Sequence, residues 1–271
     1  MPAPIVTFLS DFGIEDWFVG VVHGVVNEVA PEAHVVDLNH QIPPGHIARG
    51  AFLLEAAAPD FAPGTVHLAV VDPGVGTDRR ALAVFARGQY FVGPDNGLLE
   101  WALASDDAAV HALTEPRWFR SPVSRTFHGR DVFGPVAGHL AHGVPITQMG
   151  PRIPDPLRLA SASPRTEGAT LVGRVVFIDR FGNALTNLTA TALNDAFGAA
   201  VPPERYRVAL LDRVVKGISR SYGDAPVGAL VAVMGSSGRL EVAQVGGDAA
   251  VRMGIGEGDP VVVSLTEASP H

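Results

Sequence analysis

The 271-residue sequence contains no cysteine. Disulfide bonds, thiolate metal ligands and thiol nucleophiles are therefore excluded. Lysine is almost absent too: only Lys216 among the 20 basic residues is a lysine. An arginine in this chain is therefore weaker evidence than usual that its position requires the planar geometry of a guanidinium group. The formal net charge is −8, which argues against a nucleic-acid backbone as the main partner.

Long hydrophobic runs and common nucleotide motifs are also missing. No stretch of about 18–20 residues is apolar and free of charge, proline and glycine, so we expect no membrane span. The N-terminal sequence MPAPIVTFLSDFG lacks the basic and apolar regions of a secretory signal, and we expect a soluble cytoplasmic protein. There is no P-loop, no G-x-G-x-x-G fingerprint and no G-x-S-x-G elbow, so nucleotide phosphate binding and serine hydrolysis have little support.

Apolar residues are abundant, at 47% of the chain against 18% charged residues, which is enough for a buried core. In the first half, short apolar runs alternate with segments of helical periodicity. We expect strands at 4–9, 34–38 and 65–72, with helices at 16–31 and 46–59 between them. A hairpin-like pair at 81–86 and 90–94, and further helices at 95–104 and 131–143, follow. This alternation predicts an α/β domain over 1–154, with a mostly parallel sheet flanked by helices.

The pattern changes after Gly150. The following segment is rich in proline and small residues, and it predicts a linker at 155–168. Beyond it, short β-rich runs are separated by glycine turns. That pattern predicts a smaller antiparallel β-barrel-like domain over 169–271.

Two acids follow strands of the predicted parallel sheet. Asp11 comes after the first strand, and Asp72 comes after the third, within the turn VVDPGVGTDRR. Ligands bind beyond the carboxyl ends of parallel strands, because loops and helix N-termini meet there. Each acid alone is also compatible with a helix cap or a turn former. Their placement at one edge favours a site.

A second dense polar segment is RTFHGRDVFGP, over residues 125–135. His128 stands just before the expected helix and could act as a base or proton relay. The alternative is a histidine packed between Phe127 and Phe133, with its ring nitrogen satisfied. Spacing alone favours this second interpretation.

Polar residues interrupt the apolar strands of the second domain at 177–188 and 233–247. Either segment is compatible with a simple hairpin turn. Asp179 with Asn183, and Ser236 with Ser237, would also suit a zwitterionic or purine-like ligand. Aspartate can hold an ammonium group, serine hydroxyls can hold a carboxylate, and asparagine can read a heteroaromatic edge.

Ten histidines raise the question of a metal site. His139 and His142 lie three residues apart, and a second set recurs every six residues: His34, His40 and His46. Neither pattern matches H-E-x-x-H, and no acid has a suitable offset. We therefore expect no dedicated metal site and no cofactor.

Five segments resemble, in order and spacing, the S-adenosyl-L-methionine hydroxide adenosyltransferases, also called adenosine-forming S-adenosylmethionine hydrolases: SDFG, VVDPGVGTDRR, TFHGRDVFGP, IDRFGNALTN and GSSGRLEVA. The related fluorinase and chlorinase share this plan. The resemblance covers nearly the whole chain. It implies hydrolysis of S-adenosyl-L-methionine to adenosine and L-methionine without a metal. It also implies a homotrimer, with each active site between the N-terminal domain of one subunit and the C-terminal domain of the next.

The resemblance also implies roles for individual residues. It places Asp72, Arg79 and His128 around the attacking water, and it matches Asp11 to the acid that holds the ribose diol. The other matches fall at the two ends of the substrate: Asp179 and Ser236 for methionine, Asn183 for adenine, and Glu241 and Gln244 on the adenine side. Arg79 beside Asp72 is expected to weaken that carboxylate as a base. This leaves His128 as the candidate proton acceptor and Asp72 as the group that orients the water.

Three alternatives remain open. The first is a halide-dependent, chlorinase-like adenosyl transferase. The halogenases carry tyrosine at the position of Asp72, and a carboxylate repels a halide while accepting a hydrogen bond from water. Gly129 stands where the fluorinase has a halide-binding serine. The second is a non-catalytic protein that binds adenosine or S-adenosylmethionine, and the third is an unrelated metal hydrolase.

Overall fold

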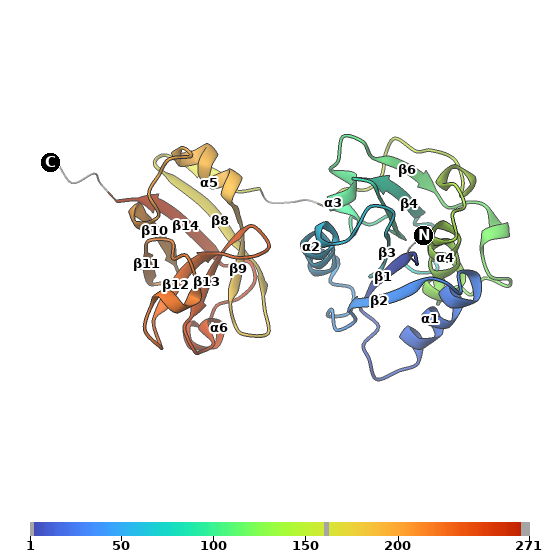
Figure 1. Cartoon of the computed structure of the whole chain (residues 1–271), viewed down its shortest axis with the longest axis horizontal. Helices are drawn as coiled ribbons and strands as arrows, with labels where there is room; N and C mark the ends of the chain where they lie inside the picture. The colour runs from blue at the N-terminus through green and yellow to red at the C-terminus, as the bar shows by residue number, and fades with distance from the viewer. Residues whose placement is uncertain (1–2, 160–162, 267–271) are drawn as a thin grey trace. The chain divides into compact units, whose positions relative to one another are not determined.

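The computed structural model describes residues 3–159 and 163–266. The chain divides into two compact units, which we call unit 1 (Met1–Ala160) and unit 2 (Ser161–His271), and each has its own hydrophobic core. Figure 1 draws unit 1 in blue to green and unit 2 in yellow to red. No helix in the described ranges is both long and apolar enough to cross a membrane.

Unit 1 is built on a six-stranded sheet in the order β2-β1-β3-β5-β4-β6. Strands β2, β1, β3 and β5 run parallel, whereas β4 pairs antiparallel with both β5 and β6. The strands are β1 (Ile5–Ser10), β2 (His34–Asn39), β3 (Val66–Val70), β4 (Ala81–Ala86), β5 (Gln89–Pro94) and β6 (Ala109–Ala112). The prediction of a mostly parallel sheet with a hairpin-like pair is confirmed.

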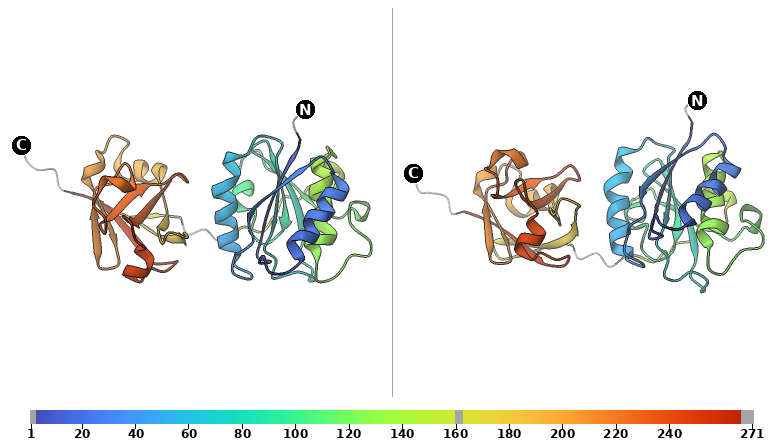
Figure 2. Two further views of the ribbon diagram at one scale, coloured as in Figure 1. Left: turned by 60° about the horizontal axis from the view of Figure 1, so that its bottom comes forward. Right: turned by 90° about the horizontal axis from the view of Figure 1, so that it is seen from below.

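Helices cover both faces of this sheet (Figure 2). One face packs its apolar side chains against α1 and α4, and the other packs against α2 and α3. The helices are α1 (Phe18–Val29), α2 (Ile47–Ala57), α3 (Glu100–Leu103) and α4 (Gly134–Ala141). Short helical turns complete the unit: η1 (Ala58–Asp60), η2 (Pro116–Trp118), η3 (Gly129–Phe133) and η4 (Ile146–Gln148).

The helix expected over 131–143 differs from the structure at its beginning. The turn η3 is π-helical, and the amide of Gly134 donates to the carbonyl of Gly129, five residues back. Pro135 has no N–H with which to continue an ordinary helical ladder. The regular helix α4 therefore begins only at Gly134, and the wide turn before it holds His128 at its start.

Unit 2 is an antiparallel, barrel-like sheet in the order β11-β10-β14-β8-β9-β13-β12, with β7 paired to β8. Its two ends approach each other, because Ser219 beyond β11 donates a backbone hydrogen bond to Ala232 of β12 at 2.7 Å. This agrees with the predicted fold class. The strands are β7 (Arg165–Glu167), β8 (Thr170–Ile178), β9 (Ala184–Thr189), β10 (Tyr206–Leu210), β11 (Arg213–Lys216), β12 (Leu230–Met234), β13 (Arg239–Gln244) and β14 (Pro260–Leu265). The helical elements are α5 (Ala190–Phe197), α6 (Ala249–Met253), η5 (Pro203–Arg205) and η6 (Tyr222–Asp224).

The segment expected to be a linker, 155–168, makes more contacts than a linker would. Asp95, which is 2% exposed, accepts hydrogen bonds from Leu157 N and from Arg80 Nε, both at 2.7 Å. A buried carboxylate needs such partners, so it draws this segment onto unit 1. At the other end, Arg165–Glu167 forms β7, an unexpected strand of unit 2.

Candidate active site

Three segments that are distant in sequence meet at one cleft of unit 1. Asp11 lies in the loop after β1, Asp72 lies in the loop after β3, and His128 immediately precedes η3. All three line the same cavity, with a volume of about 310 Å³. The other lining residues are mainly apolar: Phe12, Phe18, Val70, Val75, Thr126, Phe127 and Gly129. Of these, sequence reasoning singled out only Phe127 and Gly129.

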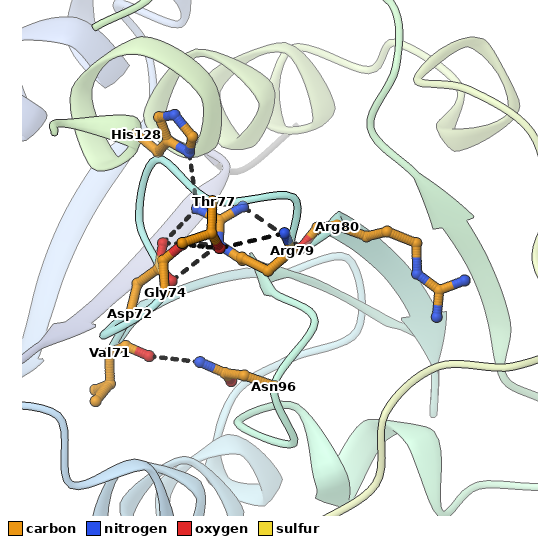
Figure 3. Close-up of polar contacts among 8 residues, drawn as sticks. All are labelled: Val71, Asp72, Gly74, Thr77, Arg79, Arg80, Asn96 and His128. Carbon is orange, nitrogen blue, oxygen red and sulfur yellow. Dashed lines mark hydrogen bonds and ion pairs between the residues drawn. The ribbon is translucent and has the colours of Figure 1, made fainter. Parts of the chain in front are cut away.

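Arg79 lies behind the cleft and connects two of its polar residues (Figure 3). Its Nε atom donates to both oxygens of Asp72, at 2.9 and 3.0 Å, and its Nη2 also donates to Oδ2 of Asp72. The same Nη2 lies 2.7 Å from Nδ1 of His128. The side chains of Asp72 and Arg79 are 5% and 10% exposed. The predicted trio is therefore one connected group, in which Asp72 and Arg79 are largely buried and His128 is half-buried.

These contacts fix the state of His128. Arginine has donors only, so Nδ1 of His128 must accept the hydrogen bond from Arg79. Burial lowers the pKa of His128, and the positive charge of Arg79 lowers it further. The neutral ring then carries its hydrogen on Nε2 and has no free lone pair for another proton. The geometry favours His128 as a donor from Nε2 and not as the proton acceptor that the sequence suggested.

The loop between β3 and β4 owes its shape to small and polar residues. Thr77 donates from its hydroxyl to the Gly74 carbonyl at 2.6 Å, which closes a tight turn between Asp72 and Arg79. Gly76 has φ +78°, and a Cβ atom there would lie 2.3 Å from the carbonyl oxygen of Arg125. Only glycine allows this close approach. The loop is thereby packed against the segment that leads to His128.

Asp11 is held in position by the chain beyond β2. Its Oδ2 accepts a hydrogen bond from the Gly45 amide at 2.7 Å. Burial raises the pKa of Asp11, and the negative charge of Asp72 raises it further, whereas the Gly45 hydrogen bond opposes both. The electrostatic influence of Asp72 on Asp11 fits their position at a shared cleft.

In unit 2, two of the predicted residues contact each other. Asp179 and Asn183 form the turn between β8 and β9, where Asp179 Oδ2 accepts from the Asn183 side-chain amide at 2.8 Å. Its Oδ1 accepts from the backbone amides of Asn183 and Phe181, at 2.9 and 2.8 Å. The Phe181 side chain is 74% exposed beside this turn.

The other predicted residues of unit 2 lie on β13 or in the turn that precedes it. Ser236 and Ser237 occupy the turn between β12 and β13, at the opposite end of the β9–β13 pairing from the Asp179 turn. The Ser237 hydroxyl oxygen is buried and has no hydrogen-bond partner among the described residues. Gln244 donates to the Gly228 carbonyl at 3.2 Å.

Glu241 lies on β13 and is 5% exposed. It accepts a hydrogen bond from the Tyr222 hydroxyl at 2.6 Å, and burial raises its pKa, as does the charge of Asp179. Burial and the hydrogen bond to Glu241 raise the pKa of Tyr222, so its hydroxyl stays protonated. Sequence reasoning missed Tyr222, because a lone tyrosine in a glycine-rich segment carries no signal.

Potential metal ligands come together in a different set from those that histidine spacing singled out. Over residues 3–159 and 163–266, one group of three such side chains converges: His23, Asp37 and His40. None of them lines the cleft with Asp72.

Both units match family models. Residues 6–150 match the SAM hydroxide adenosyltransferase N-terminal domain, and residues 173–262 match the C-terminal domain. Proteins named (R)-S-adenosyl-L-methionine hydrolase from Thermus thermophilus and Salinispora arenicola are 44% and 42% identical, over 94% and 96% of this chain and 98% of each relative. A Nocardia brasiliensis fluorinase is 29% identical over 89% of this chain and 90% of its own. The crystal structure of an uncharacterized conserved protein from Thermotoga maritima is similar at a TM-score of 0.89 and 33% identity, covering 96% of this chain and 99% of that one.

Proposed function

We propose that this chain, which belongs to the SAM hydroxide adenosyltransferase family, hydrolyses S-adenosyl-L-methionine to adenosine and L-methionine. Full-length relatives that carry the hydrolase name support the reaction class. The observation that carries the proposal is the linkage of Asp72 and His128 through Arg79 at the wall of one cleft.

In this proposal, a water molecule lies in the cleft between Asp72 and His128. It donates one hydrogen bond to the Asp72 carboxylate and accepts one from Nε2–H of His128. The water attacks the ribose C5′ carbon in line with the sulfonium, and the C5′–S bond breaks as the C5′–O bond forms. Positioning of this kind contributes up to about 7–11 kcal/mol in well-oriented reactions.

The reaction needs no metal or redox cofactor, because the sulfonium leaves as a neutral thioether. After the new bond forms, the oxygen is a protonated alcohol, which is far more acidic than a carboxylic acid. Asp72 can therefore accept its proton although it is a weak base, and then release that proton to solvent. Arg79 keeps the Asp72 carboxylate aimed at the cleft.

The remaining residues would bind the ribose, methionine and adenine parts of the substrate. Asp11 would bind the ribose diol. Unit 2 would supply the other contacts: Asp179, Ser236 and Ser237 for the methionine end, and Asn183, Glu241 and Gln244 for adenine. We propose that the chain forms a homotrimer in which unit 1 of one subunit and unit 2 of the next complete each site.

Halide transfer is the alternative that the fluorinase relatives raise. Two local features favour water. The carboxylate of Asp72 lines the cleft, where it would repel an anion. A Cβ atom at Gly129 would lie 3.1 Å from the Phe12 ring, which leaves little room for a halide-binding side chain at that position.

Product analysis tests the proposal. The protein is incubated with S-adenosyl-L-methionine with and without chloride, and the nucleosides are separated by chromatography. We expect adenosine in both cases, and Asp72→Asn should lower kcat by about 100-fold or more. Formation of 5′-chloro-5′-deoxyadenosine would favour the halide transferase, and tight adenosine binding without turnover would favour a binding protein.

A neighbouring acid provides the matched control. Asp78 lies in the same loop and is exposed, so Asp78→Asn should keep the wild-type rate. Circular dichroism must show that both variants fold, because Asp72→Asn leaves the Arg79 guanidinium with a neutral partner. Equal rates for both variants and the wild type would remove Asp72 from the mechanism.

A further inference from the structure

Two histidines and one aspartate converge between α1 and β2, away from the proposed catalytic trio. His23 lies on α1, Asp37 lies on β2, and His40 directly follows β2. Oδ1 of Asp37 is 2.7 Å from Nε2 of His23 and 2.9 Å from Nε2 of His40. One potential ligand atom from each residue therefore lies within 4.8 Å of the other two.

The environment of His40 singles it out. Its side chain is 4% exposed, and its Nδ1 is held by the Ser10 hydroxyl at 2.7 Å. This contact fixes the ring so that Nε2 faces Asp37. Nε2 lies 2.9 Å from Oδ1 of Asp37 without a well-aligned hydrogen bond to a described residue.

Such an arrangement suits a cation. A buried imidazole nitrogen without a well-aligned hydrogen bond costs free energy, and in the tautomer whose hydrogen is on Nδ1 the Nε2 lone pair faces a carboxylate oxygen. A divalent metal ion resolves both, because imidazole nitrogen and carboxylate oxygen are ordinary zinc ligands. The hydroxyl behind His40 corresponds to the outer hydrogen bond that usually orients a metal-bound histidine.

We propose that Nε2 of His23, Nε2 of His40 and Oδ1 of Asp37 bind a divalent transition-metal ion of the zinc type. Water would complete the tetrahedral coordination from the open side, where the Asp37 side chain is 43% exposed. The same exposure lets the carboxylate shift outward by the small distance that a bound ion requires.

This ion would stabilise structure and take no part in catalysis. It would join α1 to β2, and it would hold the backbone of His40, whose carbonyl accepts from the Gly13 amide at 2.7 Å. Ser10, behind His40, also accepts from the Phe12 amide at 3.3 Å. These contacts reach the loop that carries Asp11, so metal binding should also order that loop.

Calorimetric titration tests the site. The full chain is first dialysed against a chelator and then titrated with Zn²⁺, with its melting temperature measured in parallel. We expect one saturable ion per chain and a higher melting temperature with Zn²⁺. Asp37→Asn and His23→Asn, both at partly exposed positions, should abolish that binding, and Ser10→Ala should weaken it by about 10-fold or more.

A surface pair provides the control. His142 lies 2.9 Å from Glu32 and is 60% exposed, so His142→Asn should leave the Zn²⁺ stoichiometry and affinity unchanged. The proposal fails if the wild type binds no Zn²⁺ in the micromolar range. It also fails if Asp37→Asn and His23→Asn, shown to be folded by circular dichroism, bind Zn²⁺ as the wild type does.

Discussion

Arg79 contacts two residues that lie 7 and 49 positions away, and it does so with a single guanidinium group. Its Nε and Nη2 atoms meet the Asp72 carboxylate while Nη2 also reaches His128, and the group packs 5.1 Å from the centre of the Phe133 ring. A lysine ammonium has no planar fork with which to make the same contacts. In a chain with one lysine, composition alone could explain an arginine, but this geometry requires it.

Arg79→Lys therefore tests geometry separately from charge. We expect kcat to fall by about 10- to 100-fold, because the charge remains while the fork that aligns Asp72 and His128 is lost. Steady-state measurement of adenosine release gives the rate. Arg213→Lys is the control, since Arg213 is exposed and pairs loosely with Asp212 at 3.5 Å. Similar rates for both variants would mean that a positive charge at position 79 is sufficient.

His67 gives unit 1 a sensitivity to acid. It is fully buried on β3, and burial lowers its pKa from 6.5 to about 4. Because the folded-state pKa lies below the unfolded value, the unfolded chain binds the proton more readily. The contribution of His67 to stability is thus complete above pH 6.5 and is lost as the pH falls toward 4.

The non-titrating variant His67→Gln should lose less stability on acidification. Between about pH 7.5 and about pH 5, the wild type should lose about 2 kcal/mol more unfolding free energy than the variant. Urea unfolding at the two pH values measures this difference. Equal losses would show that His67 is not protonated on unfolding in this range.

At the scale of elements, two irregular segments form the proposed catalytic wall. The β3–β4 loop carries Asp72 and Arg79, and the π-helical turn η3 begins directly after His128. Their contact depends on Gly76, whose missing side chain allows the Arg125 carbonyl to approach. The regular elements of unit 1 could be predicted from periodicity. These two segments could not, because their shapes come from contacts between them.

Gly76→Ala should separate the two segments. Both a positive φ and a contact of 2.3 Å oppose the new methyl group, so we expect a loss of about 2–3 kcal/mol in unfolding free energy and a lower kcat. Gly64→Ala is the matched control, with φ +86° but open space around its Cβ. It should cost about 1 kcal/mol and leave kcat unchanged. An equal effect of both variants on kcat would contradict the proposed role of this contact.

At the scale of the whole molecule, the candidate residues divide between two separately packed units. The proposed water-activating trio lies in unit 1, and the residues proposed to bind adenine and methionine lie in unit 2. If each site forms between two subunits, as proposed, two inactive variants can complement each other. A variant with an intact unit 1 and a variant with an intact unit 2 then form one intact site between them.

Mixed oligomers test this arrangement. Asp72→Asn and Asp179→Asn chains, each inactive alone, should regain activity when co-assembled, with about a quarter of the sites intact after random mixing. Asp72→Asn co-assembled with His128→Gln should show no recovery, because both changes affect unit 1. Recovery in neither mixture, or a monomer by light scattering, would rule out shared sites.

The sequence by itself determined the order of strands and helices in unit 1, the two fold types and the segments that carry the catalytic candidates. Hydrophobic periodicity and turn residues are local properties, and so the chain displays them directly. Only the tertiary structure decided that Arg79 bonds to Nδ1 of His128, that Asp95 holds residues 155–159 on unit 1, and that His23, Asp37 and His40 converge. Such contacts join distant positions, and their geometry depends on packing and burial, which no spacing in the chain encodes.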